Sequence, residues 1–355
     1  MQPVAVRILH PRPGATAGPL ERSLASAREA NANRLVGLFR QAGVGDVQLE
    51  SGVADALPFG ARLRRLVEAL PDGAGLVVLG SGAIPLASRR DVRRFAGVAA
   101  AGDRLALANS FYSADIVAIG DASVLRSVAD LPSDNALPRW LEEVAGFEVD
   151  DLRRRWRLAV DLDSPLDVLL TRCRLDPPTD TTLVEARLDR LRAVAGDRRA
   201  ELVLAGRTNA ATLRWLERST ASRTRALIEE RGLRASSAVA LPATGRPAAA
   251  RPPRSVLGLL LDERGPEALG AVIADLGDGA LVDSRVLLAH RLGAEESAWP
   301  SAEDRFASDL LLADRIVDPW LRALTTGARD ASVPILLGGH TLVGPGIRLA
   351  LGSRR

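Results

Sequence analysis

The hydrophobic positions in the first half of the chain predict short buried strands that alternate with amphipathic helices. Each strand is a short apolar run, and most are followed by a stretch in which apolar residues recur with helical spacing. Strands are expected at residues 4–9, 46–51, 74–80, 103–109, 115–120 and 157–163, and helices at 22–43, 59–70, 89–102 and 137–146. This alternation, with near-continuous apolar strands, favours an α/β fold built on a largely parallel sheet that is covered on both faces.

The second half is richer in helices and contains a stretch without any period. Helices are expected at residues 184–196, 210–232 and 301–316, and the last of these starts with a capping pattern of Ser301 and Asp304. Apolar runs predict strands at 200–206, 255–265, 285–291 and 332–339. Residues 235–255 are rich in Ala, Pro and Arg, which is typical of a mobile loop or linker.

The length of the chain favours two domains. A chain of 355 residues exceeds what one hydrophobic core usually organises. The predicted organisation is a three-layer α/β/α domain at residues 1–172, followed by a helix-rich α/β domain at 184–355. Hydrophobic residues make up 47% of the chain, but no apolar run reaches the roughly 18 residues of a membrane span. The N-terminus lacks the features of a signal peptide, so a cytoplasmic location is expected.

Charge and residue usage exclude several kinds of chemistry. The chain contains no lysine, which excludes a Schiff base, a P-loop lysine and a lysine general base. One cysteine and three histidines argue against a disulfide framework and a zinc centre, and leave oxygen ligands for Mg²⁺ or Mn²⁺. The net charge is only +3, and basic residues alternate with acidic ones along the helices. Aromatic residues are 3% of the chain, so nucleic-acid binding is not expected.

The stretch RLAVDLDSPLDVLL, residues 157–170, is the most informative part of the sequence. Its apolar start predicts the end of a buried strand, and Pro165 predicts the first turn of a helix. Asp161 and Asp163 would then lie where the strand gives way to the helix, which is the sheet edge at which ligands and divalent cations bind. The other interpretation is that Asp163 or Ser164 caps the helix, and the spacing alone is compatible with both.

Small and polar residues follow other predicted strands. Gly80, Ser81 and Gly82 form a glycine-rich turn that would let a ligand approach the backbone before a helix N-terminus. The same residues also suit a tight turn without a ligand. A second set has side chains that bind bases, sugars or carboxylates but also make turns and caps: Asn109, Ser113, Asp134 and Asn135. In the second half, Arg207 follows a predicted strand, Asp283 lies just before the strand predicted at 285–291, and His340 lies in a glycine-rich turn.

Three motifs in residues 1–172 resemble the GT-A nucleotidyltransferases, in particular the enzymes that guanylylate phospholactate or the molybdenum cofactor. The turn LGSGAIPL is similar to their GDxPLL turn, and PSDNALPRWL lies where they hold a substrate loop. The third motif, AVDLDSPLDVLL, is close to their DIDTPEDL element. The turn LGSGAIPL has no carboxylate, and the N-terminal loop offers only Arg12, Arg22 and backbone amides to a triphosphate.

The resemblance implies a reaction and a set of residues. A nucleotidyl group would pass from a nucleoside triphosphate to a small phosphorylated metabolite, with Mg²⁺ held by Asp161 and Asp163. Arg12 and Arg22 would contact the phosphates, and Ser81 with Gly82 would line the nucleotide turn. The alternative is a protein that keeps the fold without turnover. It would bind a nucleotide or sugar phosphate, or act as a scaffold for a protein partner or a second copy of itself.

Overall fold

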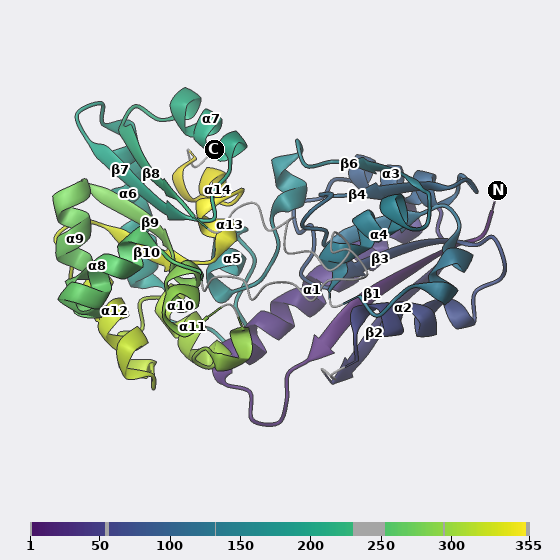
Figure 1. Ribbon diagram of the computed structural model, residues 1–355, viewed down its shortest axis with the longest axis horizontal. Helices are drawn as coiled ribbons and strands as arrows, with labels where there is room; N and C mark the ends of the chain where they lie inside the picture. Colours follow the sequence, from purple (N-terminus) through teal and green to yellow (C-terminus); the bar gives the residue numbers. More distant parts are fainter. Residues whose placement is uncertain (1, 54–56, 132, 230–252, 294, 353–355) are drawn as a thin grey trace, which may run out of the picture. The chain divides into compact units, whose positions relative to one another are not determined.

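Two compact units make up the part of the chain that the structure describes. The computed structural model describes residues 2–53, 57–131, 133–229, 253–293 and 295–352. Within these limits the first unit comprises residues 2–16 and 25–162, and the second comprises 17–24 and the residues from 163 onward. Each unit has its own β-sheet (Figure 1). The predicted linker at 235–255 falls almost entirely outside the described residues.

The sheet of the first unit has six strands and is mostly parallel. The strands are β1 (Val4–Arg12), β2 (Asp46–Val53), β3 (Gly75–Gly80), β4 (Leu105–Ala108), β5 (Ile116–Ile119) and β6 (Glu148–Asp151). Their order is β2-β1-β3-β5-β4-β6. Strand β5 is antiparallel to both of its neighbours, whereas the other pairs are parallel. The carboxyl ends of five strands therefore meet at one edge, where the β4–β5 loop also lies.

Helices cover both faces of this sheet, because successive strand residues point to opposite sides. Ala5 belongs to a core cluster with α2, η1 and α4, and Val6 belongs to another cluster with α1 and α3. The elements are α1 (Pro19–Gln41), α2 (Phe59–Glu68), α3 (Arg89–Ala99), η1 (Ala122–Ser127), η2 (Asp134–Ala136), α4 (Leu137–Glu143) and η3 (Trp156–Ala159). The first unit is thus a three-layer α/β/α sandwich, and all its expected helices are present.

The second unit contains a four-stranded parallel sheet. Its strands are β7 (Glu201–Gly206), β8 (Arg223–Ile228), β9 (Gly279–Asp283) and β10 (Ile335–Gly338), in the order β10-β9-β7-β8. The chain goes from β7 to β8 on one side and reaches β9 on the other. In open α/β sheets, ligands often bind outside the carboxyl ends of strands at such a switch point.

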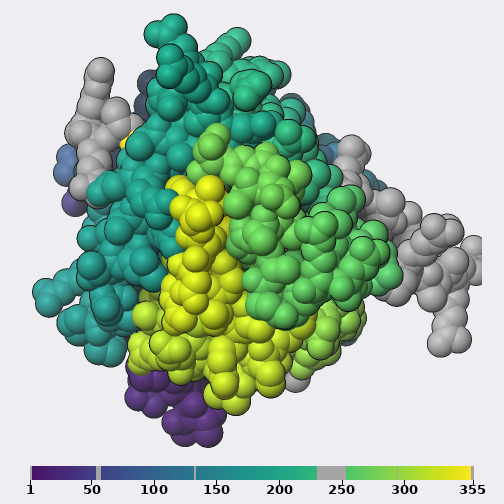
Figure 2. All heavy atoms as spheres, turned by 90° about the vertical axis from the view of Figure 1, so that its left-hand side faces the viewer, coloured from purple at the N-terminus to yellow at the C-terminus, as the bar shows by residue number. Residues whose placement is uncertain are grey.

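Helices α6, α9 and α12 pack against this sheet. Helices α9 and α12 also pack against each other, where green and yellow-green atoms meet in Figure 2. The helices of the second unit are α5 (Pro165–Leu170), α6 (Thr182–Gly196), α7 (Ala210–Ser219), α8 (Val256–Arg264), α9 (Leu269–Leu276), α10 (Ser284–Leu292), α11 (Ala302–Asp309), α12 (Pro319–Arg329), α13 (His340–Val343) and α14 (Ile347–Leu351). Short 3₁₀ turns connect them at η6 (Pro266–Ala268), η7 (Glu296–Ala298) and η8 (Ala313–Arg315).

Three predicted elements of the second half are wrong. The helix expected at 210–232 ends with α7, and residues 223–228 form β8, which pairs with β7 along its whole length. The runs at 255–265 and 285–291, expected as strands, lie in helices α8 and α10. Both of these helices start at a side-chain cap: Ser255 Oγ accepts a hydrogen bond from Gly258 N, and Asp283 Oδ1 accepts one from Arg285 N. The caps favour helices at 255–265 and 285–291, and pairing with β7 makes residues 223–228 a strand, although the apolar pattern of each segment predicts otherwise.

We predict that Gly60→Ala destabilises the protein, although alanine is the better helix former. A Cβ at Gly60 in α2 would lie 1.9 Å from the backbone oxygen of Ala129, which a flexible side chain cannot relieve. Overpacking of this kind costs about 2 kcal/mol. Gly97 in α3 is the matched control, because its Cβ would meet nothing within 4 Å and alanine there should stabilise by up to about 1 kcal/mol. Urea unfolding followed by circular dichroism measures both, and equal effects of the two substitutions would contradict the packing.

Candidate functional site

The aspartate-rich segment after Arg155 is not a strand, so the strand expected at 157–163 is wrong. Residues 156–159 form the 3₁₀ turn η3, and Val160 and Leu162 are fully buried. The side-chain amide of Asn109 donates to the Leu158 carbonyl at 2.9 Å, and Leu162 N donates to the Gly82 carbonyl at 3.0 Å. These backbone groups are therefore satisfied by a side chain and a turn rather than by a neighbouring strand.

The helix expected at Pro165 is confirmed, and so is its cap. Ser164 is the N-cap of α5, and its hydroxyl accepts a hydrogen bond from Asp167 N at 3.3 Å. The Asp167 carboxylate completes a capping box, since its Oδ2 accepts a hydrogen bond from the backbone N of Ser164 at 2.8 Å. Asp163 is not the cap. Its own backbone N donates to Asp167 Oδ2 at 3.1 Å, and its side chain is exposed.

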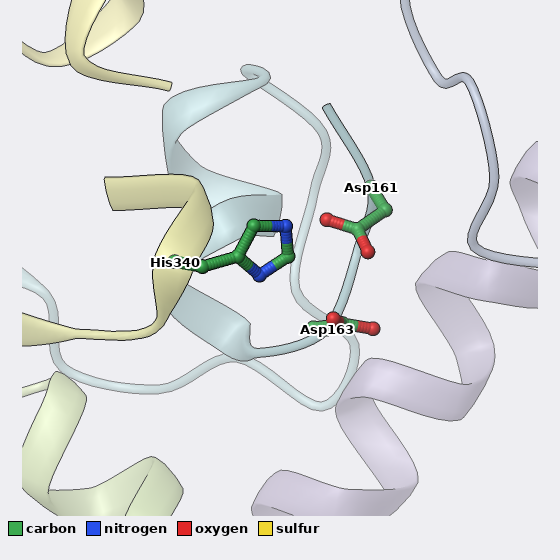
Figure 3. A group of neighbouring side chains, drawn as sticks. All are labelled: Asp161, Asp163 and His340. Carbon is green, nitrogen blue, oxygen red and sulfur yellow. The ribbon is translucent and has the colours of Figure 1, made fainter. Parts of the chain in front are cut away.

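Asp161 and Asp163 bring carboxylate oxygens together. One oxygen of each lies within 4.8 Å of the other, and Asp161 is 7% exposed. Asp163 also has a neighbour within the second unit, because a ring nitrogen of His340 lies within 4.8 Å of its carboxylate oxygen. Figure 3 shows the two aspartates on one segment and His340 on the first residue of α13. The sequence pattern indicated the two aspartates, but it gave no sign that His340 lies near Asp163.

Asp167 is the most strongly perturbed carboxyl group near this segment. Burial raises its pKa to about 7, the charge of Asp163 adds to the rise, and the hydrogen bond from Ser164 opposes it. Its Oδ1 atom is buried and has no hydrogen-bond partner. A protonated Asp167 would avoid a buried charge, so this side chain takes up a proton more readily than an ordinary aspartate does.

The glycine-rich turn after β3 is filled by the chain itself. Ser81 is buried, and its hydroxyl lies 3.1 Å from Nδ1 of His10. The Asn31 side-chain amide donates to the carbonyl of Ser81 at 2.8 Å. A Cβ on Gly82 would lie 3.0 Å from the Leu162 carbonyl oxygen. Burial lowers the pKa of His10, although Glu29 works in the opposite direction. Close packing therefore favours glycine at position 82, whereas a Cβ on Gly80 would meet nothing within 4 Å, and the turn holds the Leu162 segment.

Asn109 has a structural role that the sequence did not show. Its buried side chain spans the loop between β4 and β5, because Oδ1 accepts from Asp115 N at 2.9 Å and Nδ2 donates to the Asp115 carboxylate at 2.7 Å. Ser113 is exposed on the same loop, and its backbone N donates to Ser110 Oγ at 3.2 Å. Asn109 therefore shapes the loop that carries Ser113 rather than presenting its amide to solvent.

The remaining predicted substrate residues are dispersed. Arg12 is exposed at the carboxyl end of β1 in the first unit, whereas Arg22 is exposed in the part of α1 that belongs to the second unit. Asp134 and Asn135 lie on η2 before α4, and the Asp134 carboxylate accepts a hydrogen bond from Asn135 N at 2.9 Å. At the carboxyl edge of the first sheet the structure thus groups Arg12, Gly80, Ser81, Gly82, Asn109, Ser113 and Asp161.

Paired charges occupy the carboxyl edge of the second sheet. At the β7–β9 switch point, Arg207 Nε donates to the Asp283 carboxylate at 2.7 Å, and Asp283 is almost fully buried. Arg285 donates to the buried carboxylate of Asp309 with Nη2 at 2.7 Å. Burial works to lower the pKa of Arg285, but the charge of Asp309 outweighs it and the pKa is raised. These arginines hold buried aspartates, which explains their position after the strands without an anion.

Comparison with protein-family models and with curated proteins finds no match to this chain. Among the described helices, none combines the length and the apolar character that crossing a bilayer requires. The observations that bear on function are therefore those of the chain's own geometry.

We predict that Asp167→Asn flattens the pH dependence of stability. The folded protein keeps the proton of Asp167 up to a pKa of about 7, whereas the unfolded chain loses it near the ordinary value of 3.8. The resulting stabilisation is complete below the unfolded pKa and is lost as pH rises, by up to about 1.4 kcal/mol per pH unit. Asparagine can still accept the hydrogen bond from Ser164 N but does not titrate.

Asp91→Asn is the matched control, since Asp91 occupies the same position of a capping box on α3. The pKa of Asp91 is lowered, because hydrogen bonds from Ser88 and the charge of Arg155 outweigh its burial. Its stabilisation is therefore constant above the unfolded pKa of 3.8. Between pH 5 and pH 8, the free energy of unfolding should fall less in Asp167→Asn than in the wild type and in Asp91→Asn. Identical slopes in all three proteins would contradict the assignment.

Proposed function

We propose that the protein is a metal-dependent nucleotidyltransferase of the GT-A type, which transfers a nucleotidyl group from a nucleoside triphosphate to a small phosphorylated metabolite. The observation that carries the proposal is that carboxylate oxygens of Asp161 and Asp163 lie within 4.8 Å of each other on either side of Leu162, whose backbone N donates to the Gly82 carbonyl. The three-layer arrangement of the first unit supports it, because the resemblance of residues 1–172 implies a sandwich of this kind.

The donor atoms suit a divalent cation. Two carboxylates supply hard oxygen ligands, which Mg²⁺ and Mn²⁺ prefer, and the imidazole near Asp163 is tolerated better by Mn²⁺. Asp161 and Asp163 would hold Mg²⁺ or Mn²⁺ in this proposal. A bound cation would draw charge off the nucleotide phosphates and favour the departure of pyrophosphate.

The chain's own groups would position the substrates. Arg12 is exposed at the end of β1 and can donate several hydrogen bonds to phosphate oxygens. Ser81 is held by His10 and by main-chain bonds, so the turn keeps one conformation and would present a rigid wall to the nucleotide.

A second candidate function is binding without turnover. The turn between Gly80 and Gly82 contains no carboxylate, and its Ser81 side chain is occupied by His10. Such a turn would support a nucleotide-binding or scaffold protein with one carboxylate fewer than the family motif provides. This candidate shares the nucleotide site with the first and differs from it in the absence of pyrophosphate release.

We predict that one nucleoside triphosphate raises the thermal unfolding midpoint only when Mg²⁺ or Mn²⁺ is present. Ligand at a hundredfold excess over its Kd stabilises the folded state by about 2.7 kcal/mol, or roughly 5 °C. The rise should disappear in Asp163→Asn. It should persist in Asp103→Asn, because Asp103 is exposed at the opposite edge of the first sheet, before β4.

Pyrophosphate release separates the two candidates. Release with the stabilising nucleotide and a mixture of phosphorylated metabolites supports the transferase. A metal-dependent rise in midpoint without release supports binding alone. If no triphosphate changes the midpoint, or if Asp163→Asn responds like the wild type, nucleotide binding at this site is wrong with or without turnover, and the scaffold alternative is favoured.

A further inference from the structure

A cavity of about 580 Å³ opens in the first unit, next to β6 and the β4–β5 loop. It lies beyond the Gly80–Gly82 turn along the same sheet, on the side of the outer strand β6. Its walls combine four arginines, three acids and two aromatic rings: Arg94, Phe111, Tyr112, Glu142, Val149, Asp150, Asp151, Leu152, Arg153, Arg154 and Arg155. None of the residues predicted from the sequence lines it.

The walls of the cavity are well fixed. Leu152 N donates to the Ala108 carbonyl at 3.0 Å, which continues the pairing of β6 with β4. Arg155 then forms an ion pair with the buried carboxylate of Asp91 at the start of α3. The opposite wall is the β4–β5 loop, whose ends are joined by the buried amide of Asn109. The two walls are therefore held by hydrogen bonds and an ion pair that do not involve a ligand.

Two of the four arginines form no close ion pair within the described part of the chain. Arg153 is paired with Asp151 at 3.1 Å, and Arg155 with Asp91. Arg94 is 3.9 Å from Asp150, which is too long for a hydrogen bond. Arg154 forms no ion pair with any residue in the described part of the chain. Guanidinium groups with uncommitted donors match the oxygens of a phosphate group.

The aromatic residues give the cavity an apolar wall. Phe111 and Tyr112 form an edge-to-face pair with ring centroids 4.8 Å apart. Such rings stack against a planar or apolar organic group. The four arginines are balanced by Glu142, Asp150, Asp151 and the Asp91 partner of Arg155, so the cavity has no excess of positive charge that would attract a polyanion. A single phosphate would be held by hydrogen bonds from individual guanidinium groups.

We propose that this cavity binds a phosphate monoester, with the phosphate on Arg94 and Arg154 and the organic part against Phe111 and Tyr112. The inference rests on the proposed function, in which the cavity would receive the phosphorylated acceptor. It concerns binding alone, so it can be tested without nucleotide or metal. The ester could be a metabolite or a mononucleotide, and these share the chemistry that the cavity recognises.

Calorimetric titration of the full chain with phenyl phosphate, without a divalent cation, tests the proposal. We expect binding that is about tenfold weaker in Arg154→Ala and in Arg94→Ala, since each variant loses a charge-assisted contact. Arg93→Ala is the matched control, because Arg93 is exposed on the same helix but does not line the cavity. Circular dichroism checks that the variants are folded.

Inorganic phosphate, phenol and AMP complete the experiment. Phosphate and phenol should each bind at least tenfold more weakly than phenyl phosphate, because each engages only one wall. Tighter binding of AMP would assign the site to a mononucleotide, and tighter binding of phenyl phosphate to a smaller ester. Equal binding by wild type and Arg154→Ala, or equal loss in Arg93→Ala, would overturn the proposal. These results do not depend on whether Asp163→Asn loses its nucleotide response, so the two proposals can fail separately.

Discussion

The arrangement of the candidate site depends on how the backbone is held at Leu162. Its N–H donates to the Gly82 carbonyl, and its own carbonyl accepts a hydrogen bond from Arg28 Nε at 2.6 Å. Its side chain is fully buried, as is that of Val160. In an extended segment, residues two apart point to the same side. Anchoring Leu162 inward therefore leaves Asp161 and Asp163 together on the other side, which explains why their oxygens approach each other.

Two capping boxes show how the surroundings of one motif decide its electrostatics. Asp91 and Asp167 both accept hydrogen bonds from the serine that starts their helix. Both are penalised by burial, but Asp91 also has Arg155 as a partner, and its pKa is lowered. For Asp167, burial outweighs the hydrogen bonds from Ser164, and the charge of Asp163 adds to the rise of its pKa to about 7.

Local signals in the sequence predicted the parts of the fold that local interactions decide. Pro165 and the serine before it marked α5, and Ser301 marked the start of α11, where its hydroxyl accepts from Asp304 N at 3.1 Å. Five of the six strands of the first sheet followed from their apolar runs. Strand β6 was not predicted, because its sequence EVDD is not apolar and only pairing with β4 makes it a strand. The segment 223–228 was missed because its arginines, alanine and leucine favour a helix, and only pairing with β7 makes it a strand.

The residues of the candidate site could also be predicted only where a local pattern in the sequence marks them. Asp161 and Asp163 could be named because they lie only two residues apart in the chain. His10, Arg28 and Asn31, which fix the turn and the Leu162 backbone, are distant in sequence from the groups they bind. Asn109 was named as a ligand-binding residue, and its short polar side chain instead closes a loop. Residue type alone does not distinguish these roles, because the same amide can serve a backbone or a ligand.

The proposed function requires Asp161 and Asp163 to hold a divalent cation together, and electron paramagnetic resonance of Mn²⁺ measures this binding without an acceptor. We expect one Mn²⁺ bound per chain, competition by Mg²⁺, and loss of binding in both Asp161→Asn and Asp163→Asn. Binding that survives both substitutions, or no binding by the folded wild-type protein with or without a nucleoside triphosphate, would show that the two aspartates do not form a metal site.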